Sequence, residues 1–285
     1  MLFNGIKYYY MHQIRLFIEW FLIRFNRLFF FHPKISIFTT IWFNFRVLPF
    51  KQALKLPILM YGKWSFKTLQ GKIRIEADSI THGMLAFGKD TAGYVTSPIS
   101  TLSLAKGSLI KIADGVRIGQ GVSIILYSNS QLSLGNNSSL GDNVKIICSK
   151  SIIIGAHSAI TWECQVMSFN SHYIVDACTE KVKQISNSID IGDYCWICNR
   201  TTIMPGTKIP NRTIVASNSL LSKDYTSMYY EDGIMLGGCP AKFIKKGVYR
   251  IHNREIESWL YCHFAESNDE YCSLGSIPFE RNAIK

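Results

Sequence analysis

One histidine stands out among the seven in this chain of 285 residues because of where it lies. His172 comes six residues after Val166, at the start of a gap that separates two segments with a six-residue repeat. An imidazole titrates near neutral pH, so at the edge of a cleft it can take a proton from a hydroxyl group and pass it on. His172 is therefore the candidate general base. The other histidines lie in a repeat corner or outside the repeats, and no role is assigned to them.

Two of the eight cysteines, Cys195 and Cys198, form a C-x-x-C pair, a spacing that zinc sites and redox pairs use. Cys195 nevertheless occupies a repeat position that Thr or Ser takes in neighbouring units, and no second pair accompanies it. We therefore expect no metal site. The cysteines form no regular disulfide framework and no secretory signal is evident, which favours a cytoplasmic protein.

The elements that position these residues follow a period of six. From Ile191 an aliphatic residue recurs at every sixth position, and a small or β-branched residue follows four positions after each of the first five. The aliphatic positions are Ile191, Ile197, Ile203, Ile209, Val215 and Leu221. Upstream they are Ile112, Ile118 and Ile124, then Leu134, Leu140 and Ile146, then Ile154, Ile160 and Val166. Neither a helix nor simple strand alternation has this period.

A period of six predicts a prism in which each unit is a short strand plus a corner, with three units to a turn. The aliphatic residue points inward and stacks on its equivalent eighteen residues later, which sets Ser217 directly above Asn199. Glycine, asparagine and aspartate at the corners, as in Gly192-Asp193, permit tight bends. The gap after Val166 must then contain a projecting loop, placed at residues 173–188.

The net charge of +11 is confined to the first 75 residues, where twelve basic residues face one acid, Glu19. Within them, residues 14–31 form an apolar stripe at helical spacing with the arginines off it. The stripe comprises Ile14, Phe17, Ile18, Phe21, Leu22, Phe25, Leu28 and Phe29. The interspersed charges disfavour a spanning helix, so the segment either lies on an anionic membrane or packs against protein. No nucleic-acid recognition motif accompanies the basic residues.

The repeat units resemble those of the hexapeptide-repeat acyltransferases over about residues 100–245. The resemblance is carried above all by Ile191-Gly192-Asp193-Tyr194-Cys195-Trp196-Ile197 and by Gly237-Gly238-Cys239-Pro240-Ala241-Lys242. The segment Phe43–Ala53 also looks like the opening of members from bacterial surface-polysaccharide gene clusters. The resemblance implies an all-β fold, a left-handed parallel β-helix, that assembles as a homotrimer with three sites and uses acetyl-CoA.

The resemblance also implies catalytic roles. A histidine at the place of His172 acts as general base in the family, and aspartates usually lie two and four residues before it. This chain has Asn170 and Ser168 there, and Asn170 is the second catalytic candidate. A supporting carboxylate would have to come from Asp176, Glu180 or Glu163.

For acetyl-CoA, the resemblance implies a groove between neighbouring β-helices. The residues carried over for donor binding are Trp196, Asn199, Ser217, Ser219, Ser222, Lys223 and Lys242. Small residues let the backbone approach the pantetheine arm, while lysines meet the phosphates.

The chain is predicted to contain a basic aromatic N-terminal segment (1–68), a β-helix domain (69–225) and a C-terminal tail (226–285) with a helix at Tyr249–His263. The expected function is acetyl-CoA-dependent O-acetylation of a sugar hydroxyl in a bacterial capsule or O-antigen, or in a lipid-linked precursor at the inner face of the plasma membrane. Two alternatives stay open: N-acetylation of an amino sugar or acetylation of a small molecule, and an inactive β-helix that serves assembly or binding.

Overall fold

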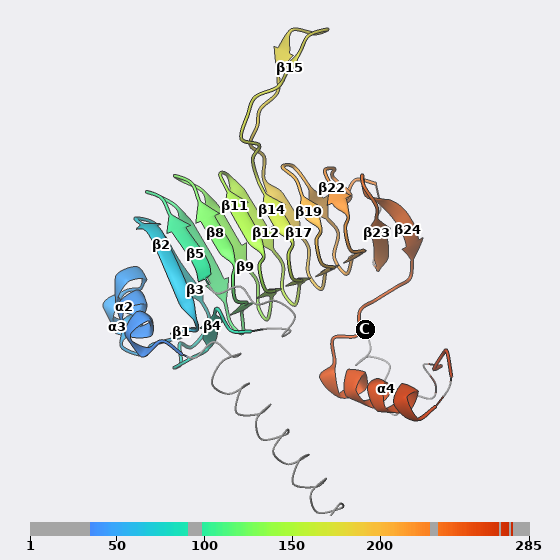
Figure 1. Ribbon diagram of the computed structural model, residues 1–285, viewed down its shortest axis with the longest axis horizontal. Coiled ribbons are helices and arrows are strands. Elements are labelled where there is room, and N and C mark those ends of the chain that lie inside the picture. The colour runs from blue at the N-terminus through green and yellow to red at the C-terminus, as the bar shows by residue number, and fades with distance from the viewer. Residues whose placement is uncertain (1–34, 91–98, 229–232, 268, 274, 276–285) are drawn as a thin grey trace, which may run out of the picture.

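The computed structural model describes residues 35–90, 99–228, 233–267, 269–273 and 275 (Figure 1). The predicted amphipathic segment at residues 14–31 lies outside these residues. Within them the chain winds into a coil whose strands form three sheets, and successive strands belong to successive sheets. We call these sheets the first, second and third faces of the coil.

The first face holds nine strands: β1 (Ile58–Met60), β4 (Leu85–Phe87), β7 (Arg117–Ile118), β10 (Ser139–Leu140), β13 (Ala159–Ile160), β18 (Trp196–Ile197), β21 (Ile214–Val215), β23 (Ile234–Gly237) and β24 (Lys242–Lys246). The second face holds seven: β2 (Lys63–Leu69), β5 (Ile99–Leu104), β8 (Ser123–Leu126), β11 (Lys145–Cys148), β14 (Gln165–Met167), β19 (Thr202–Ile203) and β22 (Leu220–Leu221). The third holds six: β3 (Lys72–Glu76), β6 (Leu109–Ala113), β9 (Gln131–Leu134), β12 (Ser151–Ile154), β17 (Ile189–Ile191) and β20 (Lys208–Ile209). Neighbours on a face pair in parallel, apart from the antiparallel pair β23 and β24.

The core of the coil is a set of aliphatic ladders that run along its axis. On the second face Ile124, Ile146, Val166, Ile203 and Leu221 are successive partners in register, and each is at most 1% exposed. Burial of one aliphatic residue per unit is what the six-residue period predicted. The prediction of an all-β parallel β-helix built from hexapeptide units is therefore confirmed. The domain boundaries at residues 69 and 225 stay predictions, and strands of the same faces lie on both sides of each.

Most corners place one residue in the left-handed region, three positions after the inward aliphatic residue. Asn143, Tyr194 and Asn218 have φ values of 56°, 57° and 57°. Asparagine tolerates this conformation better than most residues, which explains why it recurs at corners. A Cβ added to Gly192 would come within 2.7 Å of the Asn211 backbone nitrogen on the next coil, so glycine is required there.

Two adjacent isoleucines in β12 provide a test of this packing. Ile154 points inward and is 1% exposed, whereas Ile153 points outward and is 42% exposed. We expect Ile154→Ala to lower the free energy of unfolding by about 2–5 kcal/mol because it leaves a cavity in the ladder. The matched change Ile153→Ala should cost less than about 1 kcal/mol. Denaturant unfolding of both variants measures the difference, and equal losses would contradict the assigned register.

Two helices cover the N-terminal end of the coil, α2 (Ile37–Val47) and α3 (Phe50–Ala53) (Figure 1). The Ser36 side chain caps α2 by accepting a hydrogen bond from the Thr39 amide. Buried Asn44 fixes α2 to β1, because its amide donates to the Ile58 carbonyl at 2.8 Å and accepts from the Ile58 amide at 3.1 Å.

The C-terminal tail forms one further helix, α4 (Arg254–Glu266), capped by the Asn253 side chain. This helix overlaps the predicted one at Tyr249–His263 but begins later, because Asn253 is the residue that can accept the hydrogen bonds of the first turn. None of the helices among the described residues is long and apolar enough to cross a membrane.

Candidate active site

His172 lies where the chain leaves the coil. After β14 the chain projects outward, forms the antiparallel hairpin β15 (Val175–Asp176) and β16 (Lys181–Val182), and returns at β17 (Figure 1). The base of this excursion is pinned on both sides. The backbone amide of Asn170 donates to the Ile185 carbonyl at 2.9 Å, and the backbone amide of Asn187 donates to the Ser168 carbonyl at 2.9 Å. His172 is thus held at the foot of a projecting loop.

The foot of the loop borders a cleft of about 940 Å³ at the corner between the second and third faces. His172, Asn170 and Asp176 line it from the loop, and Ser222 lines it from the coil. The two catalytic candidates therefore share a cleft with one of the predicted donor residues. An exposed imidazole at the rim of a cleft of this size can reach a bound hydroxyl group.

The side chains that could orient the His172 ring are mostly engaged elsewhere. Ser168 is buried, and its hydroxyl accepts a hydrogen bond from the Ser149 amide at 2.8 Å. The Glu163 carboxylate pairs with Arg200 at 2.8 Å. Among the described residues none hydrogen-bonds the His172 ring, and Asp176 is the acidic residue that lines its cleft.

The Asp176 carboxylate serves its own turn as well as the cleft. It accepts hydrogen bonds from the amides of Thr179 and Cys178 at 3.1 and 2.9 Å, and these bonds lower its pKa. It is therefore ionised at neutral pH and can supply negative charge near an imidazolium.

Three of the predicted donor residues meet at a different corner. Trp196, Asn199 and Ser217 line a second cleft of about 610 Å³ between the first and second faces. The Ser217 hydroxyl lies 2.6 Å from the Asn199 side-chain oxygen and donates to it, so the predicted stacking of these two residues is present. Within one chain this cleft and the cleft of His172 are separate.

The remaining donor candidates line neither cleft. Ser219 is buried, and its hydroxyl donates to the Ala216 carbonyl at 2.6 Å and accepts from the Gly238 amide at 3.1 Å. Its side chain thus serves the coil rather than a ligand. Lys223 and Lys242 are both exposed on the surface near the C-terminal end of the coil.

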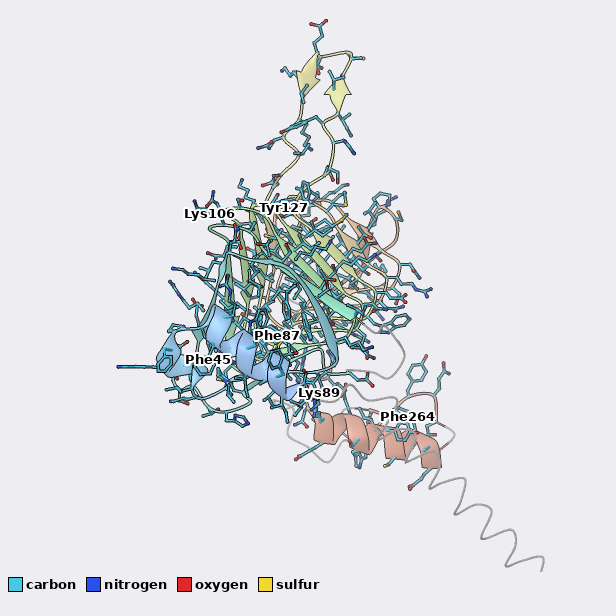
Figure 2. All side chains as sticks on the ribbon, turned by 60° about the vertical axis from the view of Figure 1, so that its left-hand side comes forward. Phe45, Phe87, Lys89, Lys106, Tyr127 and Phe264 are labelled. Carbon is cyan, nitrogen blue, oxygen red and sulfur yellow. The ribbon has the colours of Figure 1, made fainter. Side chains whose placement is uncertain are left out.

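The second cleft also contains cations that sequence reasoning missed. Arg250 and Arg254 come from the tail, and Lys89 and Arg117 from the coil. The Arg250 guanidinium lies over the Trp196 ring at 5.4 Å. Figure 2 shows Lys89 near the start of α4, in agreement with the presence of both Lys89 and Arg254, the first residue of α4, in this cleft. Four cations against the single carboxylate of Asp90 make the cleft suited to a ligand that carries phosphate or carboxylate groups.

A stack of rings fixes the tail that carries Arg250. The His157 ring stacks on Tyr194 at 4.6 Å, and the His252 ring meets Tyr194 edge-on at 5.3 Å. Burial, with Arg250 as a further cause, lowers the pKa of His252 to about 4. The ring is therefore neutral near neutral pH and packs against Tyr194 without a buried charge.

Cys195 is a structural residue in this fold. Burial raises its pKa to about 12, and its thiol donates to the Pro210 carbonyl at 3.1 Å. In the next unit the Thr201 hydroxyl makes the equivalent bond to the Ala216 carbonyl at 3.2 Å, so the Cys195 thiol takes the place of a Thr hydroxyl. The described residues contain no cluster of His, Cys, Asp or Glu that could hold a metal ion.

Comparisons with known proteins find relatives in sequence, while no protein-family model matches. The chain is 28% identical over 138 residues to a putative colanic acid biosynthesis acetyltransferase, WcaF of Escherichia coli, covering 47% of this chain and 71% of the relative. It is 23% identical over 158 residues to the putative lipopolysaccharide biosynthesis O-acetyl transferase WbbJ of Escherichia coli, covering 53% and 76%. A shorter match of 66 residues, 39% identical, joins it to a chloramphenicol acetyltransferase of Morganella morganii and covers 23% and 28%.

Among solved structures, the polysialic acid O-acetyltransferase OatWY matches with a TM-score of 0.49 and 20% identity. That match covers 70% of this chain and 99% of the other. The polySia-specific acetyltransferase NeuO matches with a TM-score of 0.42 and 16% identity over 73% and 93% of the two chains.

Proposed function

We propose that this chain, a relative of the hexapeptide-repeat acyltransferases, transfers an acetyl group from acetyl-CoA to a hydroxyl group of a bacterial surface polysaccharide, such as a capsule or O-antigen, or of its precursor. The observation that carries the proposal is His172 at the rim of a cleft, in a chain whose relatives over half its length are acetyltransferases of colanic acid and lipopolysaccharide biosynthesis.

In the proposed reaction, His172 takes the proton of the acceptor hydroxyl as that oxygen attacks the thioester carbonyl. The tetrahedral intermediate then collapses, the carbon–sulfur bond breaks, and the imidazolium returns the proton to the departing CoA sulfur. The ionised Asp176 in the same cleft supports the imidazolium electrostatically. No covalent intermediate with the protein is needed.

Donor binding is assigned to the second cleft together with Ser222. Small side chains at its corner, Ser217 and Asn199, let the pantetheine arm approach the backbone, as proposed from the resemblance. The cations Arg250, Arg254 and Lys89 fit the pyrophosphate and 3′-phosphate groups of CoA. Lys223 and Lys242 remain proposed contacts at the end of the coil.

The separation of the two clefts supports the homotrimer that the resemblance implies. Because His172 and Trp196 lie at different corners of one coil, a complete site requires the corner of a second chain. A closed ring of three copies supplies three such sites.

Mass analysis after incubation with acetyl-CoA tests the proposed reaction. The full chain is incubated with acetyl-CoA and candidate glycans, and the products are analysed for an acetyl group bound to oxygen or nitrogen. Acetyl groups that hydroxylamine removes from a glycan support the proposal. Acetyl groups found only on amino sugars, or no product with any glycan, would contradict it.

The match to chloramphenicol acetyltransferases favours one second candidate, acetylation of a hydroxyl group on a small molecule. The same incubation with chloramphenicol in place of glycan separates the two candidates, because they share the donor and differ only in the acceptor.

Residues 14–31 are proposed to hold the enzyme at the cytoplasmic face of a membrane, where lipid-linked precursors would be reached. Full-length protein should sediment with vesicles that contain phosphatidylglycerol, and less so as salt rises, because the segment combines arginines with an apolar stripe. A version that lacks residues 1–32 should bind less. The control is that the two proteins have the same thermal unfolding temperature. Equal sedimentation of the two proteins would contradict the proposal and favour packing of the segment against protein.

A further inference from the structure

Helix α2 is apolar on two opposite sides. One side packs into the core through Phe43 and Val47. The other side faces outward and carries Ile37, Phe38, Ile41, Trp42 and Phe45, of which Phe38 is 80% exposed. A helix that is apolar on two opposite sides is normally covered on both, by protein or by lipid. We therefore expect a binding partner or lipid to cover the outward side of α2.

Helix α3 extends this surface. Phe50 is 68% exposed, and its ring lies 5.8 Å from the ring of Phe45, so the two helices present one continuous patch. Leu54, just after α3, is also exposed. We call this patch the α2–α3 face; it comprises Ile37, Phe38, Ile41, Trp42, Phe45, Phe50 and Leu54. Patches of clustered aromatic and aliphatic side chains mark interaction surfaces on proteins.

The face is rigidly presented. The Trp42 ring contacts Phe66 of β2 at 5.1 Å, and Phe43 stacks on the same ring at 5.5 Å. With the hydrogen bonds of Asn44 to Ile58, these contacts lock α2 to the coil. The outward side chains are thus held in place before any partner arrives.

The surroundings of the face are positive. Residues 35–75 contain seven basic residues and no Asp or Glu. Three of them, Arg46, Lys72 and Arg74, line a cleft of about 580 Å³ between the end of α2 and the β2–β3 turn. The described residues that line this cleft include no carboxylate. It is therefore suited to the phosphate group of a ligand.

We propose that the α2–α3 face docks on an anionic lipid bilayer. Its aromatic side chains enter the interfacial region, where Trp and Phe are favoured, while Arg46, Lys51 and the cleft cations meet lipid phosphates. Charge selects this occupant over a second copy of the chain, because two such faces would bring like charges together. The surface is distinct from residues 14–31 and would act beside them.

Flotation of the full chain with vesicles tests the docking. Vesicles of phosphatidylcholine alone are compared with vesicles that also contain phosphatidylglycerol. We expect the double variant Phe38→Ser and Phe50→Ser to lower the partition coefficient onto the anionic vesicles by at least about tenfold, because both rings lose their insertion into lipid. The matched control is Tyr261→Ser with Tyr271→Ser, which removes two equally exposed rings from the tail. The control should bind like the wild type.

A second pair of variants, with reversed charges, tests the contribution of lipid phosphates to binding separately from that of the lipid chains. Lys51→Glu with Lys72→Glu should weaken binding to the anionic vesicles by at least about tenfold and flatten its salt dependence. Lys106→Glu with Lys145→Glu is the control; Figure 2 shows Lys106 at the upper left of the coil and Phe45 at its lower left. Inorganic phosphate at the concentration of the lipid headgroups should not compete, because a single ion lacks the apolar contacts.

Two results would overturn the proposal. One is wild-type vesicle binding by both test variants. The other is a serine variant whose oligomeric mass or thermal unfolding changes while vesicle binding stays the same, because the face would then be covered by a copy or a segment of this chain.

Discussion

Replacing His172 with alanine should lower the turnover number for acetyl transfer about 10²- to 10⁴-fold, the range typical for loss of a general base. Among the described residues that line the cleft of His172, Asp176 is the only carboxylate, and it is ionised, weakly basic and engaged by its own turn. Steady-state measurement of kcat with acetyl-CoA and the acceptor identified by mass analysis gives the number.

The fold should be untouched by this substitution. His172 is exposed and contributes nothing to the ladders of the coil, so thermal unfolding and oligomeric mass should match those of the wild type. His82→Ala is a matched control, because His82 is an exposed histidine near the N-terminal end of the coil, and it should keep full activity. A His172→Ala variant that retains more than about a tenth of the wild-type rate would remove His172 from the role of base.

The coil could be predicted from the sequence because the same types of side chain recur at every sixth position. A typical unit has one aliphatic residue inward and, three positions later, one residue at a left-handed corner, as at Leu140 and Asn143. The same spacing placed Ser217 above Asn199, where the structure has a hydrogen bond of 2.6 Å.

The cations of the second cleft could not be read in this way. Arg250 and Arg254 belong to a tail with no repeat, and their place depends on the packing of His252 against Tyr194, a contact between residues 58 positions apart. Nothing in the local sequence specifies such a contact. Lys89 likewise lies in the cleft only because the fold brings it together with later coils and the tail.

Small residues at corners are ambiguous in sequence for a physical reason. The coil itself favours a small or β-branched residue four positions after the inward residue, and a Ser or Thr there can donate to a carbonyl of the bend. Ser219 meets this need through Ala216, whereas Ser217 faces a cleft. Both are serines two positions apart, so only the structure separates the one that serves the coil from the one that can meet a ligand.

The separation of the two clefts leads to the second large effect. His172 lies at the corner between the second and third faces, and Trp196 at the corner between the first and second faces. A rigid coil cannot bring its own corners together. If the proposed homotrimer forms the site, His172 of one chain works with Trp196 of the next, and each interface uses one corner from each chain.

Two inactive variants should therefore restore activity to each other. His172→Ala and Trp196→Ala are each expected to be nearly inactive as pure trimers. After unfolding, mixing in equal amounts and refolding, about a quarter of the interfaces should combine an intact His172 with an intact Trp196, so activity should rise to about a quarter of that of the refolded wild type. The control mixes His172→Ala with the double variant His172→Ala and Trp196→Ala, which contains no intact histidine. Activity in the first mixture and none in the control requires a site shared between chains, whereas a site contained in one chain predicts no activity in either mixture.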